Sequence, residues 1–358
     1  MFTIKREREF ANMSKVLVTG ATGFVGRSVV SSLLVNGHQV KALVRKVSLD
    51  LPAAVEQVTG DLQDLQCIQF LPSPQSTVIK VEEDLNRTLV GVDVLVHCAA
   101  RVHVMNDDAI DALAEFRKVN TLATLSLARQ AAEAGVKRFI FVSSIKVNGE
   151  MTGGFDETCP HPIPLPGGEG VNGVFTEKDS FIPADPYGLS KYEAEQGLLA
   201  LAKETGIEVV IIRPPLIYGP GVKANFASLM KWVNKGVPLP FGAIHNQRSL
   251  VALDNLVSFI IHCIDHPKAA NEVFLISDDE DVSTTTLLQK VARAFGKKPM
   301  LIPVPVGLMT FAAKLIGKGD VANRLFGSLQ VDSSKARELL GWKPVTTMDE
   351  QLSKIVRH

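Results

Sequence analysis

The chain has 358 residues, enough for one large domain or two smaller ones, and its 46 % hydrophobic and 21 % charged residues are typical of a globular protein. Its 38 lysines and arginines balance 38 aspartates and glutamates, so charge gives no case for nucleic acid or an anionic membrane as the main partner. A small anionic ligand stays compatible with this balance, because a few arginines in one cleft can hold a diphosphate.

The N-terminal segment, the cysteines and the histidines favour a cytoplasmic protein without a metal site. Residues 1–15 (MFTIKREREFANMSK) are charged and lack the apolar region of a signal peptide, and Met13 is a second candidate start. The apolar stretch 304–316 is too short to span a bilayer, so we expect a core or interfacial helix there and no membrane insertion. His97 and His103 have no third ligand at metal spacing. The cysteines are far apart and form no CxxC pair, which predicts free thiols: Cys67, Cys98, Cys159 and Cys263.

Apolar strands alternate with amphipathic helices through the first half of the chain. The predicted strands are 15–19, 40–44, 55–58, 92–97, 138–143 and 208–213. The predicted helices are 24–36 and 113–134. Strands that are bounded by glycine and separated by helices predict a parallel sheet with right-handed crossovers. The expected fold class is therefore α/β, a Rossmann-like doubly wound parallel sheet.

The second half predicts a smaller, mainly helical C-terminal domain. Its predicted helices are 226–234, 256–265, 284–295, 308–315 and 334–340, with one strand at 272–276. Residues 71–84 are expected to form a surface segment, and residues 150–185, rich in glycine and proline, a lid or binding loop. The predicted division is an N-terminal tail at 1–13, a dinucleotide-binding domain at 14–217 with a return segment at 246–276, and a substrate-binding domain at 218–245 and 277–358.

A glycine triplet lies between the first predicted strand and the first predicted helix. In the sequence TGATGFVG, Gly20 permits a tight turn, and Gly23 lets backbone amides approach a pyrophosphate at the helix N-terminus. Gly26 lets the helix pack closely on the strand. A glycine triplet alone could be a plain turn, but here the strand and the helix stand where a dinucleotide site requires them.

The ends of the next two strands bear on the choice of cofactor. Arg45 and Lys46 follow the second strand, where an acidic residue would bind the ribose hydroxyls of NAD, so the sequence favours NADP(H) over NAD(H). Arg45 as a simple solvated side chain is the alternative, which leaves NAD(H) open. Asp61 follows the third strand and could accept a hydrogen bond from the adenine amino group or cap the next segment.

A tyrosine and a lysine four residues apart suggest acid–base chemistry. On a helix, Tyr187 and Lys191 share one face. A nearby ammonium and a positive nicotinamide ring both favour the phenolate of Tyr187, which could then exchange a proton with a sugar hydroxyl or carbonyl. Ser144 follows the fifth strand, at the edge where doubly wound sheets bind ligands, and could donate to the same substrate oxygen.

Together these motifs resemble the extended short-chain dehydrogenase/reductases of the nucleotide-sugar epimerase and reductase group, or NAD-dependent epimerase/dehydratase family. The resemblance runs from TGATGFVG through HCAARVHV, VSSIKVNG, PYGLSK, RPPLIYGPG and RSLVALDNL to SKARELLGW. It implies that Ser144, Tyr187 and Lys191 are catalytic, and that Ser144, Asn225 and Arg248 bind the substrate. The expected cofactor contacts are Gly20, Thr22, Gly23, Phe24, Val25, Gly26, Arg45, Asp61, Leu62, Ala99, Ala100, Asn120, Tyr187, Lys191 and Pro214, with Asn120 steadying the helix beside the site.

Two departures from the family pattern guide the functional prediction. Many epimerases have a VYG triplet after the catalytic serine, whereas this chain has Val147-Asn148-Gly149. Sugar dehydratases need an Asp-Glu pair beside the serine, and Ile145-Lys146 stands there instead, which disfavours dehydration. The SSIKVNG version, together with Arg45, most resembles reductases that act on a UDP-4-keto-6-deoxy-N-acetylhexosamine in bacterial O-antigen or capsule synthesis.

The leading expectation is therefore an NADPH-dependent C4 reductase of such a nucleotide sugar. The alternative is a UDP-hexose 4-epimerase, like UDP-glucose 4-epimerase, that uses the same residues with tightly held NAD. A non-catalytic dinucleotide-binding sensor is a third hypothesis, which the presence of both Tyr187 and Lys191 argues against. Dimerisation is common in the family, so a homodimer is a further expectation to test.

Overall fold

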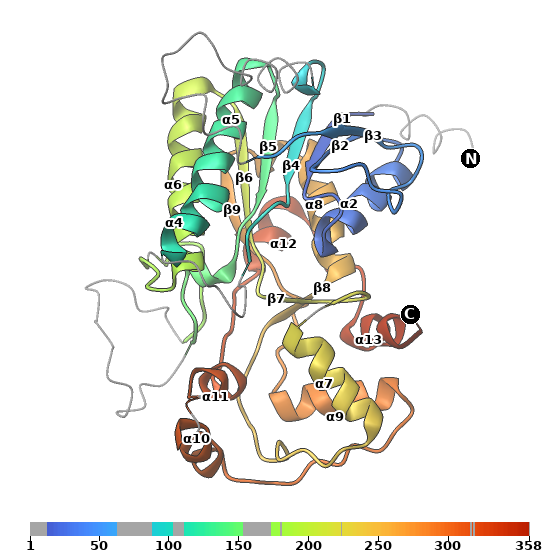
Figure 1. Ribbon diagram of the computed structural model, residues 1–358, viewed down its shortest axis with the longest axis vertical. Helices are drawn as coiled ribbons and strands as arrows, with labels where there is room; N and C mark the ends of the chain where they lie inside the picture. The colour runs from blue at the N-terminus through green and yellow to red at the C-terminus, as the bar shows by residue number, and fades with distance from the viewer. Residues whose placement is uncertain are drawn as a thin grey trace. The chain divides into compact units, whose positions relative to one another are not determined.

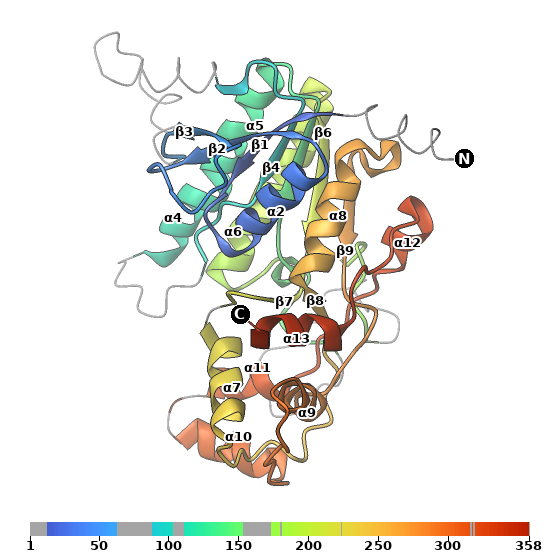
Figure 2. The same cartoon turned by 90° about the vertical axis from the view of Figure 1, so that its right-hand side faces the viewer.

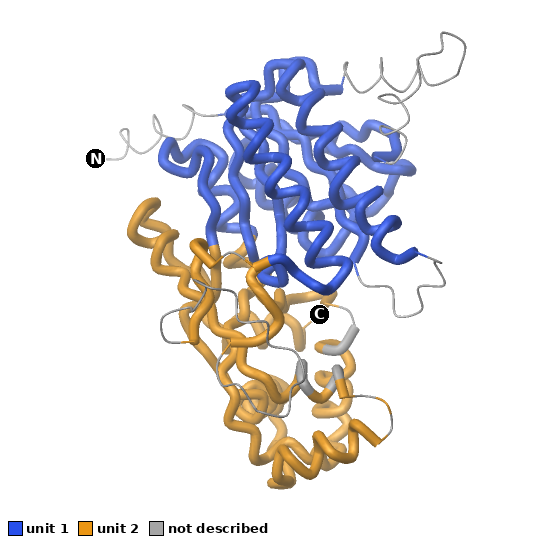
Figure 3. Tube along the Cα trace, turned by 90° about the vertical axis from the view of Figure 1, so that its left-hand side faces the viewer, with its two compact units in different colours: residues 1–147, 182–213, 257–274 blue, residues 148–181, 214–256, 275–358 orange. Residues whose placement is uncertain are grey.

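The computed structural model describes residues 13–62, 88–102, 111–152, 173–179, 181–222, 224–315, 317 and 319–357. The predicted surface segment 71–84, His103, Cys67, Cys159 and most of the predicted loop 150–185 lie outside these residues. The chain forms two compact units, shown in different colours in Figure 3. Unit 1 comprises residues 1–147, 182–213 and 257–274, and unit 2 comprises residues 148–181, 214–256 and 275–358.

A seven-stranded sheet has the order β3-β2-β1-β4-β5-β6-β9 (Figure 1). Its strands are β1 (Lys15–Thr19), β2 (Gln39–Val44), β3 (Glu56–Thr59), β4 (Val94–His97), β5 (Arg138–Val142), β6 (Glu208–Arg213) and β9 (Glu272–Leu275). The pairs from β3 through to β6 are all parallel, and Leu17 in the middle of β1 lies between Lys41 of β2 and Leu95 of β4. This arrangement confirms the predicted doubly wound α/β fold.

Helices cover both faces of this sheet, as Figures 1 and 2 show. They are α2 (Phe24–Val35), α4 (Ala112–Phe116), α5 (Ala123–Glu133), α6 (Pro186–Thr205) and α8 (Leu253–Asp265), the last of which begins in unit 2. The central strands are apolar at almost every position because parallel strands are buried on both faces. On one face, strand residues such as Leu17, Leu95 and Phe141 pack with Leu127 of α5 and Leu198 of α6 in one apolar cluster.

Unit 2 contains a short parallel pair of strands and most of the C-terminal helices. The strands are β7 (Leu216–Tyr218) and β8 (Leu250–Ala252). The helices are α7 (Ala224–Lys235), α9 (Thr284–Ala294), α10 (Val306–Leu315), α11 (Gly319–Phe326), α12 (Ser334–Leu340) and α13 (Met348–Arg357). Strands β7 and β8 and helices α11 and α13 were not among the predicted elements. No helix among the described residues is both long and apolar enough to cross a membrane.

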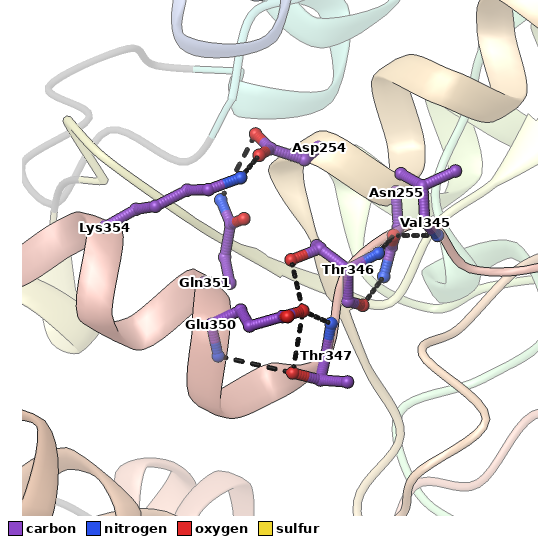
Figure 4. Close-up of polar contacts among 8 residues, drawn as sticks. All are labelled: Asp254, Asn255, Val345, Thr346, Thr347, Glu350, Gln351 and Lys354. Carbon is purple, nitrogen blue, oxygen red and sulfur yellow. Dashed lines mark hydrogen bonds and ion pairs between the residues drawn. The ribbon is translucent and has the colours of Figure 1, made fainter.

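Polar contacts attach α13 to the start of α8 (Figure 4). Thr347 and Glu350 form a capping box, in which the Glu350 carboxylate accepts a hydrogen bond from Thr347 N at 2.8 Å and Thr347 Oγ1 accepts one from Glu350 N at 3.3 Å. Lys354 then forms an ion pair with Asp254 at 2.5 Å. The Asn255 side chain makes three hydrogen bonds to the backbone that leads into α13. These contacts fix the C-terminal helix within unit 2.

Candidate active site

The glycine loop after β1 has no room for side chains at two positions. Gly20 has φ of +68°, and a Cβ atom added there would lie 2.7 Å from the backbone nitrogen of Ala99. A Cβ atom on Gly26 would lie 2.2 Å from the carbonyl oxygen of Gly20. Gly23 is the N-cap of α2 and has no side chain to satisfy the first N–H groups of the helix. Those N–H groups are therefore free of a side-chain cap and suit a bound phosphate.

The loop lies at the point where the strand order reverses. Strand β1 is flanked by β2 on one side and by β4 on the other, so the connections after β1 and β4 run in opposite directions from the middle of the sheet. The two strand ends are joined by a hydrogen bond from Cys98 N to Thr19 O at 3.2 Å. Ligands of doubly wound sheets bind at such switch points.

Most of the predicted cofactor residues lie at this carboxyl edge of the sheet in unit 1. Arg45 is exposed directly after β2. The residues after β3 and β4 are half-buried: Asp61, Leu62, Ala99 and Ala100. In the glycine loop Thr22 is exposed, while Phe24 and Val25 are half-buried. The structure brings these residues to one edge, and their contacts with a cofactor stay predictions.

A buried histidine connects the glycine loop to α5. His97 Nδ1 lies 2.7 Å from Thr19 Oγ1, and its Nε2 lies 2.9 Å from Thr124 Oγ1. The ring is fully buried and stacks on Phe141 with a centroid distance of 5.8 Å. Burial lowers the pKa of His97 to about 3, and the nearby Lys191 ammonium acts in the same direction. The imidazole is therefore neutral in the native state and serves as a hydrogen-bonding link.

We predict that His97 makes folding stability depend on pH. A histidine in the unfolded chain has a pKa of 6.5, whereas His97 in the native state stays neutral down to about pH 3, so the unfolded state binds more protons between these values. The free energy of unfolding should therefore fall as pH is lowered through about 6.5. Urea unfolding at pH 7.5 and pH 5 measures this difference, which should shrink in His97→Gln but persist in His245→Gln, a change at an exposed histidine. An unaltered difference in His97→Gln would contradict the assignment.

The helix α6 presents Tyr187 and Lys191 near the end of β5. Asp185 caps the helix by accepting a hydrogen bond from Gly188 N at 2.8 Å, which sets where the first turn begins. Lys191 is 1 % exposed, and its ammonium donates to Val142 O at 2.9 Å and lies 4.4 Å from the centre of the Phe141 ring. The structure thus confirms the helix that the tyrosine–lysine spacing required.

Burial shifts the proton affinity of both groups. It raises the pKa of Tyr187 to about 12, and a hydrogen bond with the Ser144 side chain opposes that rise. It lowers the pKa of Lys191 to about 8, and the Glu195 carboxylate opposes that fall. Near neutral pH the pair is therefore a phenol and an ammonium. Ser144, Tyr187 and Lys191 are brought together as predicted, and their catalytic roles stay predictions.

The predicted helix 113–134 is interrupted at Asn120. The backbone follows α4 to Phe116, a π-helical turn over Arg117–Leu122 and then α5. Asn120 Oδ1 accepts from Arg101 N at 2.8 Å, while its Nδ2 donates to Arg101 O and Ser190 Oγ, both at 3.0 Å. Such π turns are frequent at functional sites. Asn120 in this turn therefore connects Ser190 of α6, the residue before Lys191, to Arg101 in the segment after β4.

Comparison with known proteins agrees with this geometry. Residues 16–277 match the family model described as the NAD dependent epimerase/dehydratase family. The chain belongs to this family. The match confirms the predicted family and, with it, a nicotinamide dinucleotide as the cofactor class of this enzyme.

Relatives within the epimerase/dehydratase family align with this chain over nearly its whole length. A UDP-glucose 4-epimerase of Vibrio cholerae is 48 % identical over 337 residues, which cover 94 % of this chain and 92 % of the relative. The crystal structure of a UDP-glucose 4-epimerase from Thermotoga maritima with UDP-glucose has a TM-score of 0.68 at 24 % identity, with 96 % and 97 % coverage. A UDP-glucuronic acid 4-epimerase from Bacillus cereus in complex with NAD has a TM-score of 0.69 at 20 % identity, with 96 % and 99 % coverage. The two structures establish likeness of fold.

One charged residue beside the candidate acid–base pair of this family member was not among the site residues expected from the sequence. Ile145 and Lys146 stand where the resemblance places the acidic pair of dehydratases. The Lys146 ammonium forms a 2.9 Å ion pair with Asp185 and lies 5.9 Å from the centre of the Tyr187 ring. The cation therefore stands beside the candidate acid–base residue. Its position two residues after Ser144 in the chain was the signal that could have identified it.

Two of the three predicted substrate residues of this epimerase/dehydratase, Asn225 and Arg248, belong to unit 2, whereas Ser144 belongs to unit 1. Arg248 Nη1 donates to Gly327 O at 3.0 Å, and burial lowers the pKa of its guanidinium. Asn225 belongs to α7. Pro214, which was predicted as a cofactor contact, is buried and lies between β6 and β7 in the chain. Their roles stay predictions. Among the described residues, no three histidine, cysteine, aspartate or glutamate side chains converge as a metal site would require, and Cys98 and Cys263 are free thiols.

Proposed function

We propose that this enzyme is a UDP-hexose 4-epimerase that works with tightly held NAD. The observation that carries the proposal is the joint placement of Ser144, Tyr187 and Lys191 at the sheet edge that also holds the glycine loop. The 48 % identity to the Vibrio cholerae UDP-glucose 4-epimerase supports epimerisation ahead of reduction. The sequence alone favoured the reductase, so the two functions are now ranked the other way round.

The glycine loop fits a dinucleotide on the structure's own evidence. A methyl group at Gly26 would overlap the carbonyl oxygen of Gly20, so close approach of loop and helix is built into the fold. Gly23 leaves the first N–H groups of α2 without a side-chain cap. In this proposal those groups bind the pyrophosphate, and Lys191 donates to the hydroxyls of the nicotinamide ribose.

The protein's own residues supply the proton chemistry at C4 of the sugar. Tyr187 first loses its own proton to solvent; as the phenolate it takes the proton of the C4 hydroxyl, and it later returns one to the same oxygen. Ser144, whose oxygen accepts a hydrogen bond from Lys146 N at 3.3 Å, donates its hydroxyl proton to that sugar oxygen and stabilises its charge. When bound, oxidised nicotinamide supplies the hydride acceptor and a positive charge that favours the phenolate. The Lys191 ammonium acts on the phenolate in the same direction.

The decisive experiment follows the sugar and the cofactor together. The purified protein is incubated with UDP-glucose or UDP-galactose without added nucleotide, and products are separated by ion-exchange chromatography. The proposal expects interconversion of the two sugars and NAD released on denaturation. Failure to convert any UDP-hexose, combined with stoichiometric NADPH consumption on a UDP-4-ketohexose, would replace the epimerase with the reductase.

The C4 reductase is a second candidate because of one observation. Arg45 is exposed immediately after β2, and no acidic residue stands there to bind the adenosine ribose of NAD. A guanidinium at this place suits the extra phosphate of NADP. We predict that Arg45→Ala raises the dissociation constant of NADPH more than that of NADH, as measured by fluorescence titration. Equal effects on the two cofactors would remove the reason for preferring NADP.

A further inference from the structure

A buried carboxylate lies directly behind the candidate catalytic residues. Glu195 is 0 % exposed and accepts a hydrogen bond from Ser143 Oγ at 2.5 Å. It also accepts from Arg213, with Nε 3.1 Å from both carboxylate oxygens and Nη2 2.6 Å from Oε2. The Arg213 side chain is 8 % exposed. Because both side chains are largely buried, each charge is stabilised by the other.

This ion pair joins the three elements that build the site. Ser143 is the residue before Ser144 and follows β5, Arg213 ends β6, and Glu195 belongs to α6. Glu195 lies four residues after Lys191, so the two side chains share one face of α6. One carboxylate therefore contacts the neighbour of Ser144 and stands one helical turn from the lysine.

Among the described groups around Lys191, Glu195 is the negative charge that offsets its ammonium. From β5 the ammonium meets the Val142 carbonyl and the Phe141 ring, which are uncharged. From the end of β4 it faces His97 and Cys98, both held in their neutral forms by burial.

On α6, Tyr187 is a neutral phenol near neutral pH, because burial raises its pKa. Beyond Glu195, the next charged group that the described part of the chain supplies is a cation, the Arg213 guanidinium on β6. Burial lowers the pKa of Lys191, and the Glu195 carboxylate makes the largest contribution in the opposite direction.

We propose that Glu195 is a positioning residue for the proposed epimerase reaction: its carboxylate anchors the end of β5 beside Ser144 and keeps the buried Lys191 side chain in its charged form. Only the catalytic consequence of this inference rests on the proposed function. The electrostatic coupling of Glu195 to Lys191 exists in the protein without substrate.

The coupling is measured directly by NMR on the full-length protein. Lysines are labelled with ¹³C at Cε, and the Lys191 signal is assigned by its loss in Lys191→Arg. In Glu195→Gln, which keeps the size of the side chain and removes its charge, the titration midpoint of Lys191 should fall by about one pH unit or more. The double variant Glu195→Gln/Arg213→Gln removes both buried charges, so it avoids an unpaired cation and should fold even if the single variant does not. Its midpoint should lie between those of Glu195→Gln and the wild type.

Glu204→Gln is the matched control. Glu204 belongs to the same helix and pairs with an arginine, Arg129, at 2.8 Å, but its side chain is 59 % exposed and lies 13 residues from Lys191 along α6. Its loss should leave the Lys191 midpoint unchanged. An unchanged midpoint in Glu195→Gln or in the double variant would overturn the proposal, because a merely structural role lowers stability without moving this titration.

Turnover provides the second readout. If Lys191 must be charged, the basic limb of the kcat/KM profile should move to lower pH in Glu195→Gln by the same amount as the NMR midpoint. A shifted NMR midpoint with an unmoved profile would overturn the catalytic part of the proposal. If the wild type converts no UDP-hexose, the proposed function fails, while the NMR comparison still decides whether Glu195 controls Lys191.

Discussion

Replacing Tyr187 with phenylalanine will lower turnover by about 10²-fold to 10⁴-fold, the usual contribution of a positioned acid–base group. The change removes only the hydroxyl and keeps the ring, which packs edge-on against Phe116 at a centroid distance of 6.0 Å. The site should therefore keep its shape and lose its proton carrier. The measurement is kcat for sugar interconversion, together with the amount of dinucleotide that copurifies.

Tyr192→Phe provides the control for this prediction. Tyr192 lies on the same helix, five residues later, and is half-buried. Its loss of a hydroxyl should leave kcat within about twofold, on the scale of surface substitutions. Normal turnover in Tyr187→Phe would refute the acid–base role, and loss of bound dinucleotide in that variant would show that Tyr187 holds the cofactor instead.

Much of the sheet could be predicted because its strands carry a strong local signal. The predicted strands 15–19 and 208–213 coincide with β1 and β6, whose buried apolar runs end at polar residues or glycine. The remaining strands of the first half differ by one or two residues at their ends, where hydrogen bonding between strands rather than composition decides the boundary.

The π turn at Asn120 could not be predicted in this way. Its sequence, RKVNTL, continues the helical pattern on both sides. The interruption depends on contacts with Arg101 and Ser190, which are distant in the chain. Tertiary hydrogen bonds therefore override a local helical preference.

Helix α13 had a signal that the prediction did not use. Thr347 and Glu350 have the spacing of a capping box, which marks a helix start. The short strands β7 and β8, three residues each, gave no comparable signal because their pairing joins segments more than thirty residues apart, with Leu216 opposite Leu250.

The site residues also fall into those that the sequence could identify and those that only the structure could. Tyr187 and Lys191 could be found because one helix carries both at a fixed spacing. The pair of Glu195 and Arg213 could not, because α6 and β6 supply one charge each and only the fold shows that both are buried. Sequence spacing thus identifies groups that share an element, and the structure identifies groups that meet across elements.

Gly26→Ala is the second change with a large expected effect. The new methyl carbon would lie 2.2 Å from Gly20 O and 2.7 Å from Gly20 C, both backbone atoms that cannot rotate away. Relief requires α2 to move away from the loop, and overpacking of this kind costs about 1–3 kcal/mol. If that cost falls on the bound conformation of the loop, the dissociation constant for NAD rises by about 10-fold to 100-fold. Isothermal titration of dinucleotide-free protein with NAD measures this rise.

Gly307→Ala is the matched control, because a Cβ atom added at Gly307 in α10 would meet nothing within 4 Å. It should leave the NAD dissociation constant unchanged and stabilise the protein slightly, since alanine is favoured over glycine within a helix. The contrast separates close packing at the glycine loop from the general effect of adding a methyl group. Unchanged NAD affinity in Gly26→Ala would contradict the prediction, because the added methyl group would then strain the free and the NAD-bound loop equally.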